Sequence, residues 1–166
     1  MSYPAVHMVM IHEAAHAVMA RCSAYHRMTG ALTLGEIHGS IDVTLNNEKV
    51  RQEGKRLTPH LLKDAQVARD ACLIFVAGRM AEIIHGGNPE PESYAGDYDL
   101  ARFALKRAGL NPFALLPVAE ADCTRLLRGL WPLVVGLADH CAGKSSVEVE
   151  EVDTVLDRLF AALPKD

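Results

Sequence analysis

The sequence predicts a mainly α-helical fold with a small β element, organised as one domain over residues 1–166. Of the 166 residues, 49% are hydrophobic, which suits one globular core of ordinary size. Apolar residues recur at helical spacing over most of the chain, between glycines and prolines that end helices. Between residues 30 and 47, apolar and polar residues alternate instead, which is typical of short strands.

In the N-terminal part, the first helix is expected to run from Pro4 through residue 24, because alanines and apolar residues follow one another there. A helix of this composition would be buried nearly all round. Residues 30–47 are expected to form two short strands, with Ile37 among the alternating apolar positions. The charged stretch 46–56 is expected to be a solvated loop.

In the middle of the chain, Thr58 and Pro59 have the pattern of a helix N-cap followed by proline at the first helical position. The apolar spacing predicts a long helix from there to Ile84, before a Gly-Gly-Asn-Pro stop. Asp97 is a good N-cap residue for the next helix, which would place Asp99 in its first turn.

In the C-terminal part, two helical stretches are expected over residues 113–142, with a break near Gly129. Ser145 and Glu148 have the spacing of a capping box, which predicts a last helix ending near Leu163.

Charge and composition exclude several classes of function. The chain has 17 basic and 21 acidic residues and a net charge of −4, with no basic run that could follow a phosphate backbone, so no nucleic-acid partner is expected. The sequence has neither a secretory signal nor an apolar run of about 18 residues, so no membrane partner is expected. The cysteines are widely spaced among apolar residues and are expected to be reduced core thiols of a cytoplasmic protein: Cys22, Cys72, Cys123 and Cys141.

Two histidines lie four residues apart near the N-terminus, in the stretch His12-Glu13-Ala14-Ala15-His16. On a helix, His12 and His16 share one face and can bind one Zn²⁺ ion. Glu13, beside them, can accept a proton from a zinc-activated water and pass it to a leaving amine. This is the H-E-x-x-H pattern of zinc metallopeptidases, and the competing interpretation is a chance match on a core helix.

Two histidines make an incomplete catalytic zinc site, since such sites usually have three protein ligands and one position for water. The residues alone leave four candidates for the third ligand: Glu82, His85, Asp97 and Asp99.

Three segments resemble the peptidase domain of the FtsH-type zinc proteases, the membrane-anchored AAA proteases. That family has H-E-A-G-H-A at the metal helix, then G-R-A-A-E-E, then a segment like G-A-S-N-D-L-x-x-A. The corresponding segments here begin at His12, Gly78 and Ala95, and the similarity extends through residues 131–152.

The resemblance implies a zincin-like helical peptidase domain with Asp99 as the third zinc ligand, because the family's ligand is the aspartate of N-D-L. Asp97, in place of the family's serine, is interpreted as a helix cap. Glu82 would accept a hydrogen bond from a ligand imidazole, although a salt bridge with Arg79 is an alternative. Ala15 replaces the family's usual glycine.

The resemblance also implies partners. In zincin-like proteases an extended substrate pairs with an edge strand, and residues 30–45 could supply that edge or form only a hairpin over the core. We expect neither the family's transmembrane segment nor its ATPase module here, so the expected substrates are peptides and unfolded proteins, with a separate ATPase unfoldase as a possible partner. The family's hexameric rings make a homo-oligomer possible.

Two other functions compete with the peptidase. A catalytically silent relative could serve as a binding or adaptor module. Alternatively, the pairs Glu13/His16 and Glu82/His85 match the E-x-x-H pairs of di-iron carboxylate bundles, although that interpretation leaves His12 without a role. A relaxed P-loop match at Gly143-Lys144-Ser145 is rejected, because too little chain follows it for a nucleotide-binding fold.

Overall fold

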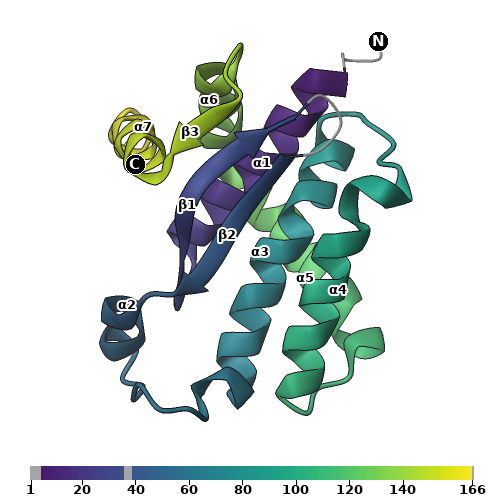
Figure 1. The fold of residues 1–166 in the computed structure, drawn as a ribbon, viewed down its shortest axis with the longest axis vertical. Coiled ribbons are helices and arrows are strands. Elements are labelled where there is room, and N and C mark those ends of the chain that lie inside the picture. Colours follow the sequence, from purple (N-terminus) through teal and green to yellow (C-terminus); the bar gives the residue numbers. More distant parts are fainter. Residues whose placement is uncertain (1–4, 36–38, 166) are drawn as a thin grey trace.

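One helix, α1 (Ala5–Cys22), lies at the centre of the fold and is covered by a small sheet and by helices on both sides. The computed structural model describes residues 5–35 and 39–165, so Pro4 and Ile37 lie outside the described residues. Figure 1 shows β1 and β2 crossing α1, with α3, α4 and α5 on one side and α6, β3 and α7 on the other. This arrangement confirms the mainly α-helical prediction with a short sheet.

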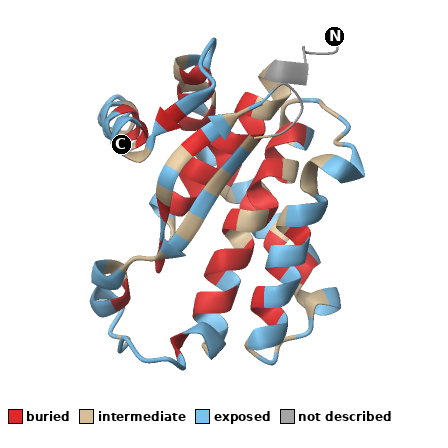
Figure 2. Ribbon diagram, in the orientation of Figure 1, coloured by how far each residue is buried: buried red, intermediate tan, exposed pale blue. Residues whose placement is uncertain are grey.

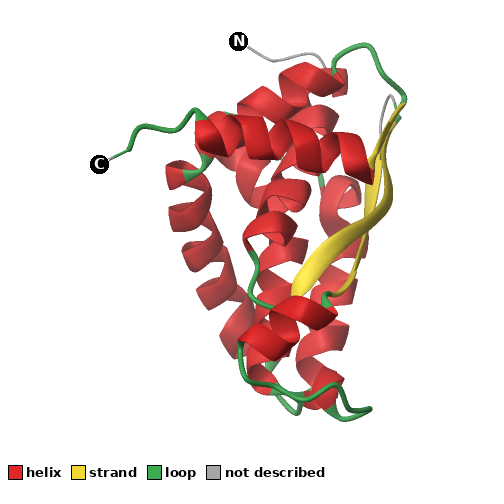
Figure 3. Cartoon of the chain, turned by 90° about the vertical axis from the view of Figure 1, so that its left-hand side faces the viewer, coloured by secondary structure: helices red, strands yellow, loops and turns green. Residues whose placement is uncertain are grey.

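Over the described residues the sheet has three antiparallel strands in the order β2-β1-β3, so β2 is an edge strand that pairs with β1. Figure 3 shows it at one side of the helical assembly. The predicted pair of strands is present, but the first starts before residue 30, and a third strand replaces the expected capping box at Ser145. The strands are β1 (His26–Leu34), β2 (Gly39–Leu45) and β3 (Ser146–Glu148).

Helix α3 (Ala65–Ile84) ends where the sequence predicted, next to Gly86, which has a φ of +88°. Its start differs, because Asp64 rather than Thr58 is the N-cap: the Asp64 side chain accepts hydrogen bonds from the first amides of the helix. A short 3₁₀ turn, η1 (Leu61–Lys63), precedes it.

Helix α4 (Pro91–Arg107) begins seven residues earlier than expected, with Glu90 as its N-cap and Pro91 at its first position. Asp97 therefore lies inside the helix and does not cap it, which corrects the earlier interpretation. Two further helices follow, separated next to Gly129 as predicted: α5 (Pro112–Gly129) and α6 (Trp131–Cys141).

The charged stretch after β2 contains a short helix, α2 (Asn47–Gln52), where a solvated loop was expected. Its formation depends on tertiary contacts: Val50 is fully buried, and Nζ of Lys49 donates to three backbone carbonyls at the end of α1 and the start of β1. The last helix is α7 (Val149–Ala161), which packs against α6.

The hydrophobic core surrounds α1, as its composition predicted. Every residue from Met10 to Ala20 is buried. Figure 2 shows that α3, which packs against α1, also has many buried residues. Three of the four free cysteines are in this core, whereas Cys22 is exposed, contrary to expectation. Among the described residues, no helix has the length and apolar character needed to cross a membrane.

Candidate metal centre

His12, Glu13 and His16 lie on the buried central helix α1. Their exposed fractions are only 5%, 4% and 3%, respectively. The i, i+4 spacing places both imidazoles on one face, with ring centres 4.8 Å apart. Three polar side chains in the otherwise apolar buried stretch 10–20 need specific partners, because an unpaired buried polar group is costly.

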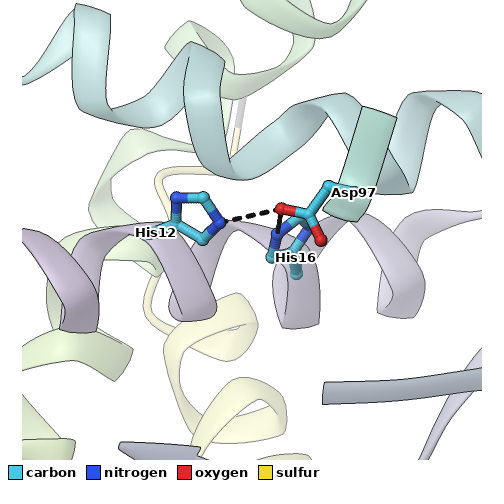
Figure 4. A group of neighbouring side chains, drawn as sticks. All are labelled: His12, His16 and Asp97. Atoms are coloured by element: carbon cyan, nitrogen blue, oxygen red, sulfur yellow. Dashed lines mark hydrogen bonds and ion pairs between the residues drawn. The ribbon is translucent and has the colours of Figure 1, made fainter. Parts of the chain in front are cut away.

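The carboxylate that meets the two imidazoles belongs to Asp97 on α4. Its Oδ2 atom lies 3.0 Å from Nε2 of His12 and 3.2 Å from Nε2 of His16 (Figure 4). Among the described residues, these three form one group whose ligand atoms all lie within 4.8 Å of one another. The chain thus brings together two residues of α1 and one residue more than eighty positions later.

Asp99, the expected third ligand, does not join this group. Its exposed side chain pairs with Arg102 at 3.1 Å, on the outer surface of α4. The physical reason is helical geometry: two residues correspond to about 200° of rotation, so Asp97 and Asp99 point to opposite sides of α4. The structure therefore places Asp97, and not the predicted Asp99, against the two histidines.

One signal in the sequence favours Asp97. Proline is common in the first turn of a helix, and Pro91 begins α4, which places Asp97 well inside it.

The second nitrogen of each imidazole is also held. Nδ1 of His12 donates to Oε1 of Glu82 at 2.5 Å, and Nδ1 of His16 donates to the backbone carbonyl of Ile74 at 2.7 Å. Such bonds fix the orientation of the rings and leave each Nε2 facing Asp97. Glu82 therefore has the contact expected of a supporting residue, and the alternative salt bridge with Arg79 is not formed, because Arg79 pairs with Glu120.

The ionisable groups of the site shift one another's pKa values. Burial alone would lower the pKa of His12, but hydrogen bonds with Asp97 and Glu82 outweigh it and raise that pKa to about 9. Burial would raise the pKa of Asp97, yet hydrogen bonds from His12 and His16 hold it well below its usual value. Burial raises the pKa of Glu13, which makes its carboxylate a stronger base.

The donor set fits a zinc ion. Two imidazole nitrogens and one carboxylate oxygen are zinc ligands, and with bonds of about 2.0–2.2 Å, tetrahedral ligands lie about 3.3 Å apart. The two distances from Asp97 to the histidines, 3.0 and 3.2 Å, are close to this separation. Moreover, His12 lies between two carboxylates, so without a cation both of its nitrogens must carry protons. A cation at Nε2 removes that requirement.

The three residues lie in a cleft of about 970 Å³ bounded by α1, α3, α4 and β2. Five consecutive residues of β2, from Gly39 to Val43, line it. Glu13 reaches towards the start of this strand: a Cβ added at Gly39 would lie 2.4 Å from Cγ of Glu13. The possible base, the three possible ligands and one edge of the sheet therefore share a single cleft.

His85 lies elsewhere. Its ring is 5.0 Å from that of His7 and 6.0 Å from that of Trp131, and it does not line the cleft. Glu82 and His85 thus do not act together as the di-iron interpretation requires.

No protein-family model matches the chain, and no curated protein matches it significantly.

Proposed function

We propose that this chain is a zinc metallopeptidase related to the FtsH-type peptidase domains. The observation that carries the proposal is the convergence of His12, His16 and Asp97 in one cleft that also contains Glu13 and an unpaired strand edge. Zinc is proposed because the donor set combines two imidazoles with one carboxylate and leaves one position for water.

A zinc ion held by these residues would polarise a peptide carbonyl and acidify water. Glu13 then accepts the proton of the attacking water while the new carbon–oxygen bond forms. It returns that proton to the amide nitrogen as the carbon–nitrogen bond breaks, so the products are a carboxylate and an amine. The raised pKa of Glu13, caused mainly by burial, suits both the basic and the acidic role.

Strand β2 would bind the substrate backbone. It is at the edge of the described sheet, where it pairs with β1, and its residues 39–43 line the cleft. An extended peptide added to this edge would place its backbone beside Glu13. We therefore propose unfolded segments and peptides as substrates, delivered where necessary by a separate ATPase unfoldase. The four free cysteines suit a reducing compartment, for which we propose the cytoplasm.

The direct test measures bound metal and peptide cleavage together. Elemental analysis of the purified chain is expected to give about one zinc per chain, whereas two irons would support a di-iron protein. Glu13→Gln is expected to keep the zinc and to reduce cleavage of an unstructured peptide by at least about 100-fold. If zinc-loaded wild-type protein cleaves none of a broad mixture of unstructured peptides, a silent binding module replaces the peptidase.

A further inference from the structure

Arg79 lies at a junction of three helices beside the metal centre but outside it. Its Nη1 atom donates to the hydroxyl of Tyr98 on α4 at 3.2 Å and to Oε2 of Glu120 on α5 at 3.1 Å. Arg79 itself belongs to α3, so a single guanidinium group joins the three helices.

The same guanidinium group packs against two aromatic rings of α4. Its central carbon lies 4.5 Å from the ring centre of Tyr94 and 5.4 Å from that of Tyr98. The two tyrosines are four positions apart, and their rings contact each other edge to face at 5.2 Å. Arg79 therefore holds one face of α4 over a full helical turn.

Asp97 lies between these two tyrosines in sequence. It follows Tyr94 by three positions and directly precedes Tyr98, which is only 5% exposed. A rotation of α4 that moved either ring would move the carboxylate of Asp97 away from the histidines. The distances of 3.0 and 3.2 Å from Oδ2 of Asp97 to the two Nε2 atoms thus depend on the rotation of α4 relative to α3.

We infer that Arg79 is a positioning residue for the metal centre: by fixing Tyr94 and Tyr98 against α3, it sets the rotation of α4 that aims Asp97 at His12 and His16. The inference rests on the proposed function only in naming zinc as the bound ion. Arg79 touches neither the cleft nor the possible ligands.

The contacts of Arg79 favour this role over a general salt bridge. Its buried Nε atom has no hydrogen-bond partner among the described residues, which carries a desolvation cost. The orientation of the guanidinium group therefore depends on its hydrogen bonds to Tyr98 and Glu120 and on its contacts with the rings of Tyr94 and Tyr98. Lysine cannot reproduce this planar contact with two rings, although it keeps the charge.

The test compares Arg79→Met with Arg102→Met. Arg102 is a matched control, because it also lies near the ring of Tyr98, at 5.9 Å, but is on the exposed surface, where its ion pair within the described part of the chain is with Asp99. Two quantities are measured on the full chain: amide hydrogen exchange over residues 94–100 without metal, and zinc affinity by chelator competition. Absorption of the Co²⁺-substituted protein reports ligand geometry.

For Arg79→Met we expect exchange over residues 94–100 to accelerate by at least about tenfold and zinc affinity to fall roughly 10- to 100-fold, with a weakened Co²⁺ band. Arg102→Met is expected to change both quantities less than about threefold. An Arg79→Met protein with wild-type exchange, zinc affinity and Co²⁺ spectrum would overturn the inference.

If Arg79→Met does not fold, Arg79→Lys and Tyr98→Phe decide in its place. Each removes part of the contact, so we expect a smaller loss of zinc affinity in both, and wild-type values in both would overturn the inference. If the wild-type chain binds no zinc, the proposed function fails. The exchange measurement, which needs no metal, still decides whether Arg79 holds α4.

Discussion

His12 and Glu82 form a buried hydrogen bond of 2.5 Å between α1 and α3, although seventy residues separate them in sequence. The carboxylate of Glu82 fixes the ring of His12 and makes its Nε2 a better electron donor to a cation. Glu82→Gln keeps the shape of the side chain but removes its charge. We expect zinc affinity, measured by chelator competition, to fall roughly tenfold while the fold is retained. Unchanged zinc affinity would show that Glu82 has no supporting role.

Asp97 and Asp99 offer a matched pair of variants on one helix. Asp97→Asn is expected to reduce zinc affinity by at least about 100-fold, because an amide is a much poorer zinc ligand than a carboxylate. Asp99→Asn removes the same charge from the exposed face of α4 and is expected to change affinity less than about twofold. Equal losses in the two variants would contradict the assignment of Asp97.

Gly78 of α3 leaves room for the imidazole of His12. A Cβ at Gly78 would lie 2.2 Å from Nε2 of His12, so the ring must move in Gly78→Ala. The usual gain from replacing a helical glycine, about 0.5–1 kcal/mol, is therefore expected to become a loss of about 1–3 kcal/mol in the free energy of unfolding. Zinc affinity is expected to fall as well.

Gly129→Ala is the control for this substitution. Gly129 is also helical, but an added Cβ there would meet no atom within 4 Å. Because Gly129 is the last residue of α5, its unfolding free energy in denaturant is expected to stay unchanged or to rise by up to about 1 kcal/mol. A Gly78→Ala protein as stable as this control, with full zinc affinity, would show that the pocket around His12 can expand freely.

Local signals predicted the parts of the fold that depend on local backbone geometry. The end of α3 beside Gly86 and the break between α5 and α6 follow from glycine and proline stops, which act within a few residues. Strand β3 was missed because its pairing with β1 joins residues more than a hundred positions apart. Helix α2 was missed because its sequence is mostly charged or polar. Val50 is its one buried residue, and tertiary packing buries it.

In the candidate site, too, the features that depend on local sequence could be predicted and those that depend on tertiary packing could not. The i, i+4 spacing of His12 and His16 is a local property, and the structure places both rings on one face as expected. The choice between Asp97 and Asp99 depended on where α4 begins, and a Gly-Asp pair resembles a helix cap when considered alone. The contact between Arg79 and the two tyrosines of α4 depends on the packing of α3, α4 and α5, so no local pattern could predict it.

The cysteines provide a test of the core that is independent of function. Cys72, Cys123 and Cys141 are at most 1% exposed, and burial raises the pKa of Cys72 and Cys123 to about 12. Cys22 lies on the surface at the end of α1, and its pKa is also raised by partial burial.

A thiol reagent at neutral pH is therefore expected to modify one thiol per native chain, slowly, and the remaining three only after unfolding in guanidinium. Cys22→Ser should remove the native reaction entirely. Rapid modification of more than one thiol in the native protein would mean that the helices around α1 open easily.

The charge of the cleft predicts a preference among peptides. Asp97 and Glu82 together offset a divalent cation, whereas Asp42, Glu90 and Glu92 at the rim have no ion-pair partner among the described residues. No lysine or arginine lines the described part of the cleft. The rim therefore keeps a negative potential that attracts cationic segments, and this attraction weakens as salt screens it.

Two peptides that differ only in carrying lysines or glutamates beside the cleaved bond measure this preference. We expect kcat/KM to favour the lysine peptide several-fold at low ionic strength, with a ratio that falls towards one at about 1 M salt, where the Debye length is about 3 Å. Glu90→Gln should reduce the ratio, whereas Asp99→Asn, which removes the same charge from α4 outside the cleft, should not. Because the two variants have the same net charge, an equal reduction in both would assign the preference to the charge of the whole protein and not to the rim.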